Sequence, residues 1–156
     1  MTRVLFICHG NICRSPMAQM ILTELVRQDK RPDQFEIDSC ATSREEIGNP
    51  IYPPAKRVLE RHSIPVLHHR ARQITRKDAE DYDYLIYMER YHESDIRRVI
   101  GAEKMGKACR LLDFTQNPRD IEYPCYTGEF EKAFSEIYEG CRAFLETVKK
   151  NETEGK

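Results

Sequence analysis

The chain has 156 residues, enough for one domain with a buried core. Its net charge of −1 lacks the basic surplus with which proteins bind nucleic acids, and no stretch approaches the roughly 18 apolar residues of a membrane-spanning helix. The six cysteines show neither the spacing of a disulfide scaffold nor that of a zinc site. We therefore expect a cytoplasmic protein without metal or cofactor, and with neither nucleic acid nor membrane as a partner.

Short apolar runs alternate with helical patterns along the chain, an order typical of a parallel sheet. The predicted strands are 4–8, 35–41, 84–88 and, more weakly, 108–112. Helices are predicted from Ser15, with Pro16 in the favoured first position, at about 54–61 and 93–99, and from Phe130 onward, where an apolar stripe indicates core. We expect residues 1–150 to form a single domain and 151–156 to be a disordered tail.

The stretch CHGNICRSP, residues 8–16, joins the first predicted strand to the first predicted helix. Backbone N–H groups that converge at a helix N-terminus favour a bound anion. Gly10 and Asn11 tolerate backbone conformations that most residues avoid, and a guanidinium at Arg14 matches two phosphate oxygens. The stretch therefore predicts a phosphate-binding loop formed by Cys8, His9, Gly10, Asn11, Ile12, Cys13, Arg14 and Ser15.

Cys8 would face the phosphorus of a bound phosphate. The helix N-terminus, the loop amides, Arg14 and the Ser15 hydroxyl all favour its thiolate over its thiol. A thiolate in this position can attack phosphorus to give a cysteinyl-phosphate, which water then hydrolyses. The sequence thus predicts Cys8 as the nucleophile, Arg14 as the phosphate clamp and His9 as an outward-pointing residue without a catalytic role.

Five segments together resemble the low-molecular-weight protein tyrosine phosphatase family over nearly the whole chain. They are CHGNICRSP, IDSCATSREEIGNP (37–50), HRARQIT (69–75), DYDYLIYMER (81–90) and YTGEFEKAFSEIYEGCRAFL (126–145). The resemblance implies an α/β fold with a four-stranded parallel sheet flanked by helices, a flavodoxin-like three-layer sandwich. It also implies hydrolysis of phosphotyrosine in proteins or of small aryl phosphates, with inorganic phosphate as a further ligand.

The resemblance assigns further roles around the loop. Ser15 would hydrogen-bond the leaving thiolate, and Cys13 would form a reversible disulfide with Cys8 that protects the nucleophile from overoxidation. The residues that would hold the loop in its strained shape are Asn11, Ser15, Ser39 and His69.

The general acid departs from the family pattern, which places an aspartate directly before a proline in a late loop. Here the loop reads DIEYPCYTG, residues 120–128, and Tyr123 precedes Pro124. A phenol stays protonated at neutral pH but is a weak acid. The order of preference is Glu122 after a loop adjustment, then Asp120, then no working acid.

The predicted substrate wall is also altered. Glu45 stands where the family often has an aromatic residue, and Cys125 replaces the first of the usual aromatic pair, so that Tyr126 alone remains. A phosphotyrosine ring would meet fewer apolar surfaces, whereas a carboxylate at Glu45 would favour a basic neighbour in the substrate.

Two alternative functions stay open, the first because of the missing aspartate and the second because of the shared loop. Without an effective acid the chain would be a pseudophosphatase that binds phosphotyrosine without turnover. An arsenate reductase, less favoured, would share the loop but needs a redox pair of cysteines after the third strand, and residues 84–106 contain none.

Overall fold

The structure is a computed structural model and describes residues 1–154. Its strands are β1 (Thr2–Cys8), β2 (Phe35–Ala41), β3 (Tyr84–Tyr87) and β4 (Ala108–Arg110). Its α-helices are α1 (Arg14–Gln28), α2 (Pro53–Arg61), α3 (Arg76–Asp81), α4 (His92–Ile100), α5 (Pro124–Thr127) and α6 (Phe130–Glu154). Short 3₁₀ helices cover Pro32–Gln34, Ala102–Lys107 and Leu111–Phe114.

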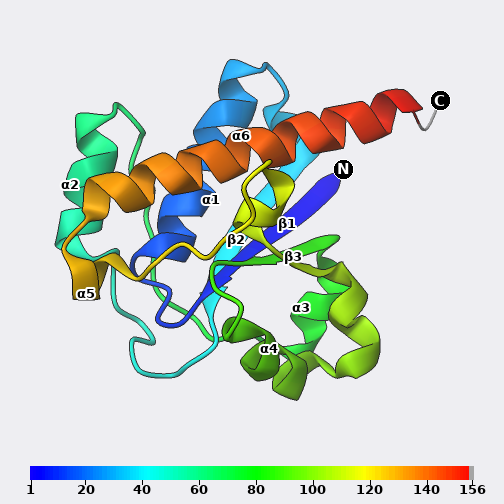
Figure 1. Cartoon of the computed structure of the whole chain (residues 1–156), viewed down its shortest axis with the longest axis horizontal. Coiled ribbons are helices and arrows are strands. Elements are labelled where there is room, and N and C mark those ends of the chain that lie inside the picture. Colours follow the sequence, from blue (N-terminus) through cyan, green and yellow to red (C-terminus); the bar gives the residue numbers. More distant parts are fainter. Residues whose placement is uncertain (155–156) are drawn as a thin grey trace.

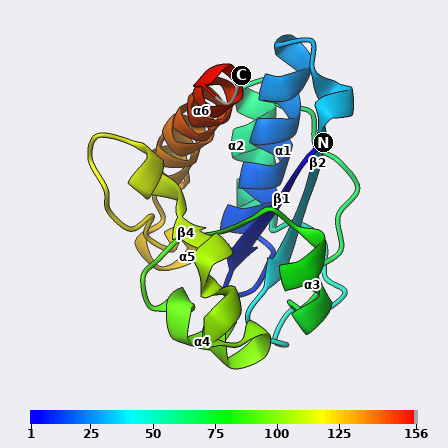
Figure 2. The same ribbon diagram turned by 90° about the vertical axis from the view of Figure 1, so that its right-hand side faces the viewer.

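The strands form one parallel sheet in the order β2-β1-β3-β4, and helices cover both of its faces (Figures 1 and 2). α1, α2 and α6 lie on one side of the sheet, and α3 and α4 lie on the other (Figure 2). The parallel order with helices on both faces confirms the predicted fold class, a flavodoxin-like three-layer sandwich.

The apolar run of β1 explains its central position. Val4 and Phe6 pack into the core beneath α1 and α6, whereas Leu5 and Ile7 pack against α3 and α4. All four side chains are completely buried. Successive strand side chains point to opposite faces, so a strand covered on both faces must be apolar throughout.

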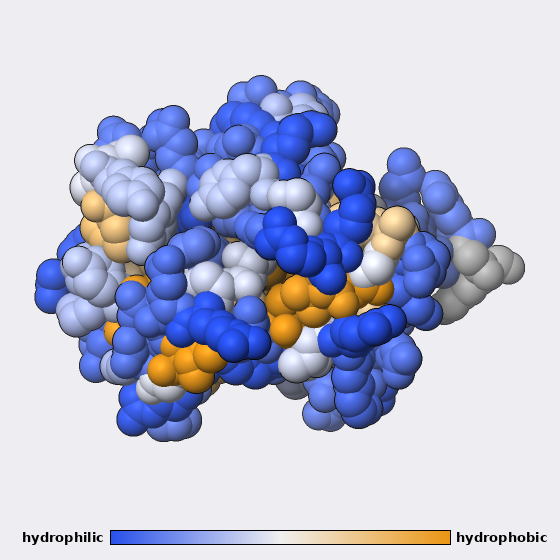
Figure 3. Space-filling view, turned by 90° about the horizontal axis from the view of Figure 1, so that it is seen from below, coloured by the Kyte–Doolittle hydropathy of each residue, from blue (hydrophilic) through white to orange (hydrophobic). Residues whose placement is uncertain are grey.

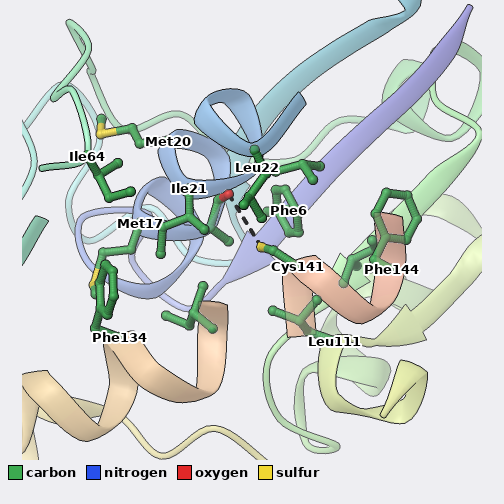
Figure 4. Packing of buried hydrophobic residues seen from close by; sticks show 14 of the residues in the cluster. Phe6, Met17, Met20, Ile21, Leu22, Ile64, Leu111, Phe134, Cys141 and Phe144 are labelled. Atoms are coloured by element: carbon green, nitrogen blue, oxygen red, sulfur yellow. Dashed lines mark hydrogen bonds between the residues drawn. The ribbon is translucent and has the colours of Figure 1, made fainter. Parts of the chain in front are cut away.

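α6 packs along α1, as the predicted apolar stripe requires. Phe134, Cys141 and Phe144 of α6 lie in one buried cluster with Met17 and Ile21 of α1 (Figure 4). The Cys141 thiol donates a hydrogen bond to the carbonyl of Ala18 at 3.7 Å, and burial raises the pKa of this thiol. Cys141 is therefore a core residue.

Gly140 allows α6 to approach the 3₁₀ helix at Leu111. A Cβ at position 140 would lie 2.5 Å from Leu111 Cγ, and Leu111 is completely buried. We expect Gly140→Ala to lower the free energy of unfolding by about 1–3 kcal/mol through overpacking, less the roughly 1 kcal/mol that alanine contributes as a better helix former. Urea unfolding measures the change.

Gly106→Ala is the matched control, because among the described residues no atom lies within 4 Å of a Cβ at that position. The additional change Leu111→Ala should relieve the overlap in Gly140→Ala, so the two substitutions together should cost less than the sum of each alone. A Gly140→Ala variant as stable as the wild-type protein would show that Leu111 moves aside freely.

The predicted elements agree with the structure apart from one or two residues at their ends. α1 begins at Arg14, one residue before the predicted start. α3 was not predicted because its sequence RKDAED has almost no apolar periodicity. It does carry a capping box, in which the Thr75 hydroxyl accepts from the Asp78 backbone and the Asp78 carboxylate accepts from the Thr75 backbone.

The predicted disordered tail is partly wrong, because α6 continues through Glu154 and residues 151–154 are helical. Arg31 donates a hydrogen bond to the carboxylate of Glu152, and Thr153 bonds back to the carbonyl of Lys149 at 3.2 Å. These contacts extend the helix beyond its apolar stripe. The last two positions of the predicted tail lie outside the described residues.

The surface seen from below is mostly hydrophilic, with hydrophobic residues in small separate groups (Figure 3). Within residues 1–154, no helix combines the length and the apolar character needed to cross a membrane.

Candidate active site

The loop between β1 and α1 lies at the carboxyl end of the sheet, below α1 in Figure 1. β1 has β2 on one side and β3 on the other, so the chain leaves the sheet in opposite directions around it. Ligands of open α/β sheets bind at such a switch point, outside the carboxyl ends of the strands. The topology thus places the predicted phosphate-binding loop where this class of fold binds its ligands.

Cys8 and Ser15 meet across the loop. Cys8 Sγ lies 3.0 Å from Ser15 Oγ, and the backbone N–H of Ser15 donates to the same sulfur at 3.4 Å. Ser15 stands in the first turn of α1, and Cys8 is the last residue of β1. The helix therefore directs hydrogen-bonding groups from its first turn at the sulfur.

Asn11 holds the loop in an unusual backbone conformation, with φ at 59°. Its Nδ2 donates to the hydroxyls of Ser15 at 2.8 Å and Ser39 at 3.0 Å, and its Oδ1 accepts from the backbone of Arg72 at 3.1 Å. His69 Nε2 donates to the Asn11 carbonyl at 2.6 Å. The structure thus brings together all four predicted support residues, and their bonds offset the cost of a left-handed asparagine.

Arg14 is only 1% exposed, yet its guanidinium is not fully paired. Nη1 donates to the Glu89 carboxylate and to the Ile121 carbonyl, the latter at 2.6 Å. Nε and Nη2 find no hydrogen-bond partner among residues 1–154. These two nitrogens form one edge of the guanidinium, the edge that binds two oxygens of a phosphate.

The charges around Arg14 keep it protonated. Burial opposes its positive charge, but the neighbouring Cys8 and the Glu89 carboxylate outweigh burial and raise its pKa. The ring of Tyr123 lies against it, with the ring centre 5.0 Å from Arg14 Cζ. Arg14 is therefore a buried, charged and oriented donor.

Glu89 and His92 are site residues to which the sequence analysis assigned no role. Glu89 lies shortly beyond the end of β3 and fixes one side of the Arg14 guanidinium. His92 is completely buried, and its Nδ1 accepts from the backbone N–H of Glu89 at 3.2 Å. Burial lowers the pKa of His92 to about 3, so it stays neutral. The signal in the sequence was the position of Glu89 behind a strand next to β1.

Glu45 and Tyr126, the two residues predicted to form the substrate wall, lie at the rim of the phosphate-binding loop. Glu45 Oε2 is 3.1 Å from His9 Nε2, and both side chains are exposed, as the outward-pointing prediction for His9 requires. Tyr126 is 88% exposed, and its ring packs edge-on against Tyr123 with the ring centres 4.9 Å apart. The Glu45 carboxylate thus lies beside His9 of the loop. The Tyr123 ring lies beside Arg14, and the Tyr126 ring packs against Tyr123.

The three candidate acids differ in their surroundings. Asp120 accepts hydrogen bonds from the Arg90 backbone and from Arg110 Nη1, each at 2.9 Å. Burial raises the pKa of Asp120, but these bonds outweigh burial and lower it, so Asp120 is ionised. Burial raises the pKa of the Tyr123 phenol, which stays protonated. Glu122 is exposed beside Tyr123.

Comparisons with known proteins agree with this geometry. The family model for low molecular weight phosphotyrosine protein phosphatase matches residues 3–154. The chain is 34% identical to the low molecular weight protein-tyrosine-phosphatase YfkJ of Bacillus subtilis, with 96% of this chain and 97% of YfkJ covered. It is 38% identical to the low molecular weight phosphotyrosine protein phosphatase of Homo sapiens, with 92% and 93% covered.

A crystal structure of Bacillus subtilis YfkJ superposes with a TM-score of 0.93 over 97% of this chain and 96% of that chain. A family model that matches nearly the whole chain, relatives above 30% identity and a shared fold all lead to one conclusion. The chain belongs to the low molecular weight phosphotyrosine protein phosphatase family.

Proposed function

We propose that this chain hydrolyses phosphotyrosine monoesters in proteins through a cysteinyl-phosphate intermediate. The observation that carries the proposal is the buried Arg14 guanidinium with Nε and Nη2 unpartnered among the described residues, close enough to Cys8 for their charges to interact. A dianionic phosphate would satisfy both nitrogens and bring its phosphorus to the sulfur.

The reaction would proceed in two steps. The Cys8 thiolate attacks phosphorus, the S–P bond forms, and the P–O bond to the tyrosine breaks as its oxygen takes a proton. Water then attacks phosphorus, releases inorganic phosphate and returns Cys8 as the thiolate, which Ser15 Oγ stabilises from 3.0 Å. Arg14 would hold two phosphate oxygens in both steps, while Asn11 and its partners keep the loop amides directed inward.

The rim suggests which substrates fit. Glu45 would favour a basic residue next to the phosphotyrosine, and the rings of Tyr123 and Tyr126 would pack beside the substrate ring. Small aryl phosphates would also be hydrolysed, and inorganic phosphate would compete for the loop. The comparisons do not favour the pseudophosphatase or the arsenate reductase, and a cytoplasmic location stays a prediction of the sequence.

The leaving oxygen needs a proton from a general acid, and the residue that supplies it has to be identified among the carboxylates of the late loop. Glu122 is the first candidate, because it is exposed and free to approach with a loop adjustment, whereas Asp120 is engaged by Arg110. Without a well-placed acid, we expect the rate to fall steeply as the leaving group of an aryl phosphate becomes more basic, and most for tyrosine with a pKa of ~10. Steady-state hydrolysis of a graded series of aryl phosphates measures this dependence.

Tyr123→Asp should restore the missing carboxylate. General acids contribute about 10²–10⁴-fold, so the variant should gain more on phosphotyrosine than on nitrophenyl phosphate, whose leaving group needs little protonation. Tyr123→Phe is the matched control, since it keeps the ring over Arg14 but removes the hydroxyl. A rate that does not depend on the basicity of the leaving group, with no gain from Tyr123→Asp, would mean that another group supplies the proton. Glu122→Gln or Asp120→Asn should then make the rate depend more steeply on leaving-group basicity. A burst of product without turnover on every substrate would overturn the proposed hydrolysis.

A further inference from the structure

A cleft of about 1110 Å³ lies between α2 and the irregular segment that follows it, residues 63–70. The segment turns back at the end of α2, where the Ile64 N–H donates to the Leu59 carbonyl at 3.0 Å, and forms the wall opposite the helix. Ile64 also packs into the core beside Met20 of α1, which holds the segment in place (Figure 4). The walls come from residues 50–70, so the cleft is separate from the phosphate-binding loop.

The rim of the cleft is basic. Lys56 and Arg57 line it from α2 and Arg70 lines it from the opposite wall, and all three side chains are exposed. Within residues 1–154 none of the three forms an ion pair, and Glu60 supplies the single carboxylate of the lining. The whole chain carries a net charge of −1, so this positive charge is a local feature. An unpaired basic rim of this kind is complementary to an anionic partner.

The floor of the cleft is apolar. Ile51 and Ile64 are buried, Val66 is half-buried, and the large side chain of Leu67 is 39% exposed. In the part of the chain that the structure describes, no hydrogen bond engages the backbone of residues 65–68. A small inorganic anion would leave this floor uncovered, whereas a peptide brings apolar side chains for the floor and backbone groups for the segment.

The cleft adjoins the back of the phosphate-binding loop. His69, one of the lining residues, donates from Nε2 to the Asn11 carbonyl at 2.6 Å. The backbone N–H of Tyr52, between two other lining residues, donates to the Ile12 carbonyl at 2.7 Å. A protein that docked in the cleft would therefore lie next to the predicted active site without occupying it.

We propose that this cleft docks an acidic segment of a partner protein, in which glutamate or aspartate side chains are interspersed with apolar ones. The carboxylates would pair with Lys56, Arg57 and Arg70, and the apolar side chains would cover Leu67 and the floor. Exposed ion pairs contribute little each, so the apolar contacts supply affinity and the charges select the partner. The segment needs no phosphate group, which makes the docking independent of the proposed hydrolysis.

Fluorescence anisotropy with the full chain tests the docking. The probe is a fluorescein-labelled, unphosphorylated peptide of Glu-Glu-Leu repeats, and the buffer contains excess inorganic phosphate to fill the predicted loop. We expect saturable binding that is at least about tenfold tighter than that of the matching Lys-Lys-Leu peptide and that weakens as salt is added. Displacement of the acidic peptide by phosphate would place it in the loop and overturn the proposal. Equally tight binding of the basic peptide, or of a single-stranded oligonucleotide, would also overturn it.

Two double variants with the same change in net charge locate the binding. Lys56→Glu with Arg70→Glu reverses the charge on both walls and should weaken binding of the acidic peptide at least about tenfold. Arg97→Glu with Lys104→Glu is the matched control, because both positions are exposed and lie on α4 and the 3₁₀ helix after it, across the sheet from α2. The control should bind within about twofold of wild type. An equal loss in both double variants would show that net charge alone acts, against the proposal.

Leu67→Ser tests the apolar floor without changing any charge. It should weaken the acidic peptide several-fold, and wild-type affinity in this variant would contradict the predicted apolar contact. Thermal melts check that each variant is folded. Because neither Lys56 nor Arg70 contacts the phosphate-binding loop, their double variant should hydrolyse nitrophenyl phosphate at the wild-type rate. Peptide binding and hydrolysis are thus separate readouts, and each can fail without the other.

Discussion

Cys8→Ser is expected to reduce hydrolysis of both phosphotyrosine peptides and nitrophenyl phosphate by at least about 10³-fold. A serine hydroxyl is not ionised at neutral pH. The hydrogen-bond contacts of the Cys8 sulfur among residues 1–154 are the hydroxyl and the backbone N–H of Ser15, and neither is a base that would activate a hydroxyl. The substitution exchanges one small buried atom for another, so the fold should persist. Initial rates with the two substrates measure the loss.

The same variant should still bind inorganic phosphate, because Arg14 and the loop amides are unchanged. Phosphate titration by calorimetry and a thermal melt therefore separate lost chemistry from lost structure. Cys109→Ser in β4 is the matched control and should keep full activity. Turnover of the Cys8→Ser variant within tenfold of wild type would show that Cys8 is not the nucleophile.

Arg14→Lys is expected to lower kcat by about 10²–10³-fold, the usual effect of losing one oriented donor in a reaction of this kind. The two sides of the Arg14 guanidinium differ in their partners. Nη1 donates to Glu89 and to the Ile121 carbonyl, whereas Nε and Nη2 have no partner among residues 1–154 and are available to a phosphate. A lysine ammonium is a single point charge, and Glu89 would hold it away from the phosphate. The loss should appear in kcat, because a planar donor pair fits the transition-state oxygens better than those of the substrate.

Arg27→Lys, near the other end of α1, provides the control for an arginine-to-lysine change in the same helix and should leave both kinetic constants unchanged. Full progress curves over a range of substrate concentrations separate kcat from KM. An Arg14→Lys variant that raised KM alone would make Arg14 a binding residue without a role in the transition state.

The layered fold and the loop could be predicted because each depends on local pattern. The apolar run at β1 must be buried on both faces, and the stripe of α6 must face a core, wherever the rest of the chain lies. The loop residues are contiguous, so Cys8, Asn11, Arg14 and Ser15 come together through the turn between one strand and one helix. Short-range geometry alone brings the predicted nucleophile to the predicted clamp.

The surroundings of the clamp depend on segments far apart in the chain. Glu89, Ile121 and Tyr123 reach Arg14 from beyond β3 and from the loop before α5, and no periodicity in the sequence connects them. The same holds for Asp120, whose pKa is lowered by hydrogen bonds from the Arg90 backbone and from Arg110 of β4, each 2.9 Å long. A candidate acid in sequence thus became a structural carboxylate through a partner that only the packing of β4 supplies.

Residue patterns in the chain were sufficient for the sheet, its covering helices and the chemistry of residues 8–16, because strand alternation, helix periodicity and a tight turn are properties of neighbouring residues. They were insufficient for the charge state of the late loop and for the helical course of residues 151–154. Both depend on pairing between distant segments, as in the bond from Arg31 to Glu152, and the energy of such a pair depends on burial and distance rather than on sequence spacing.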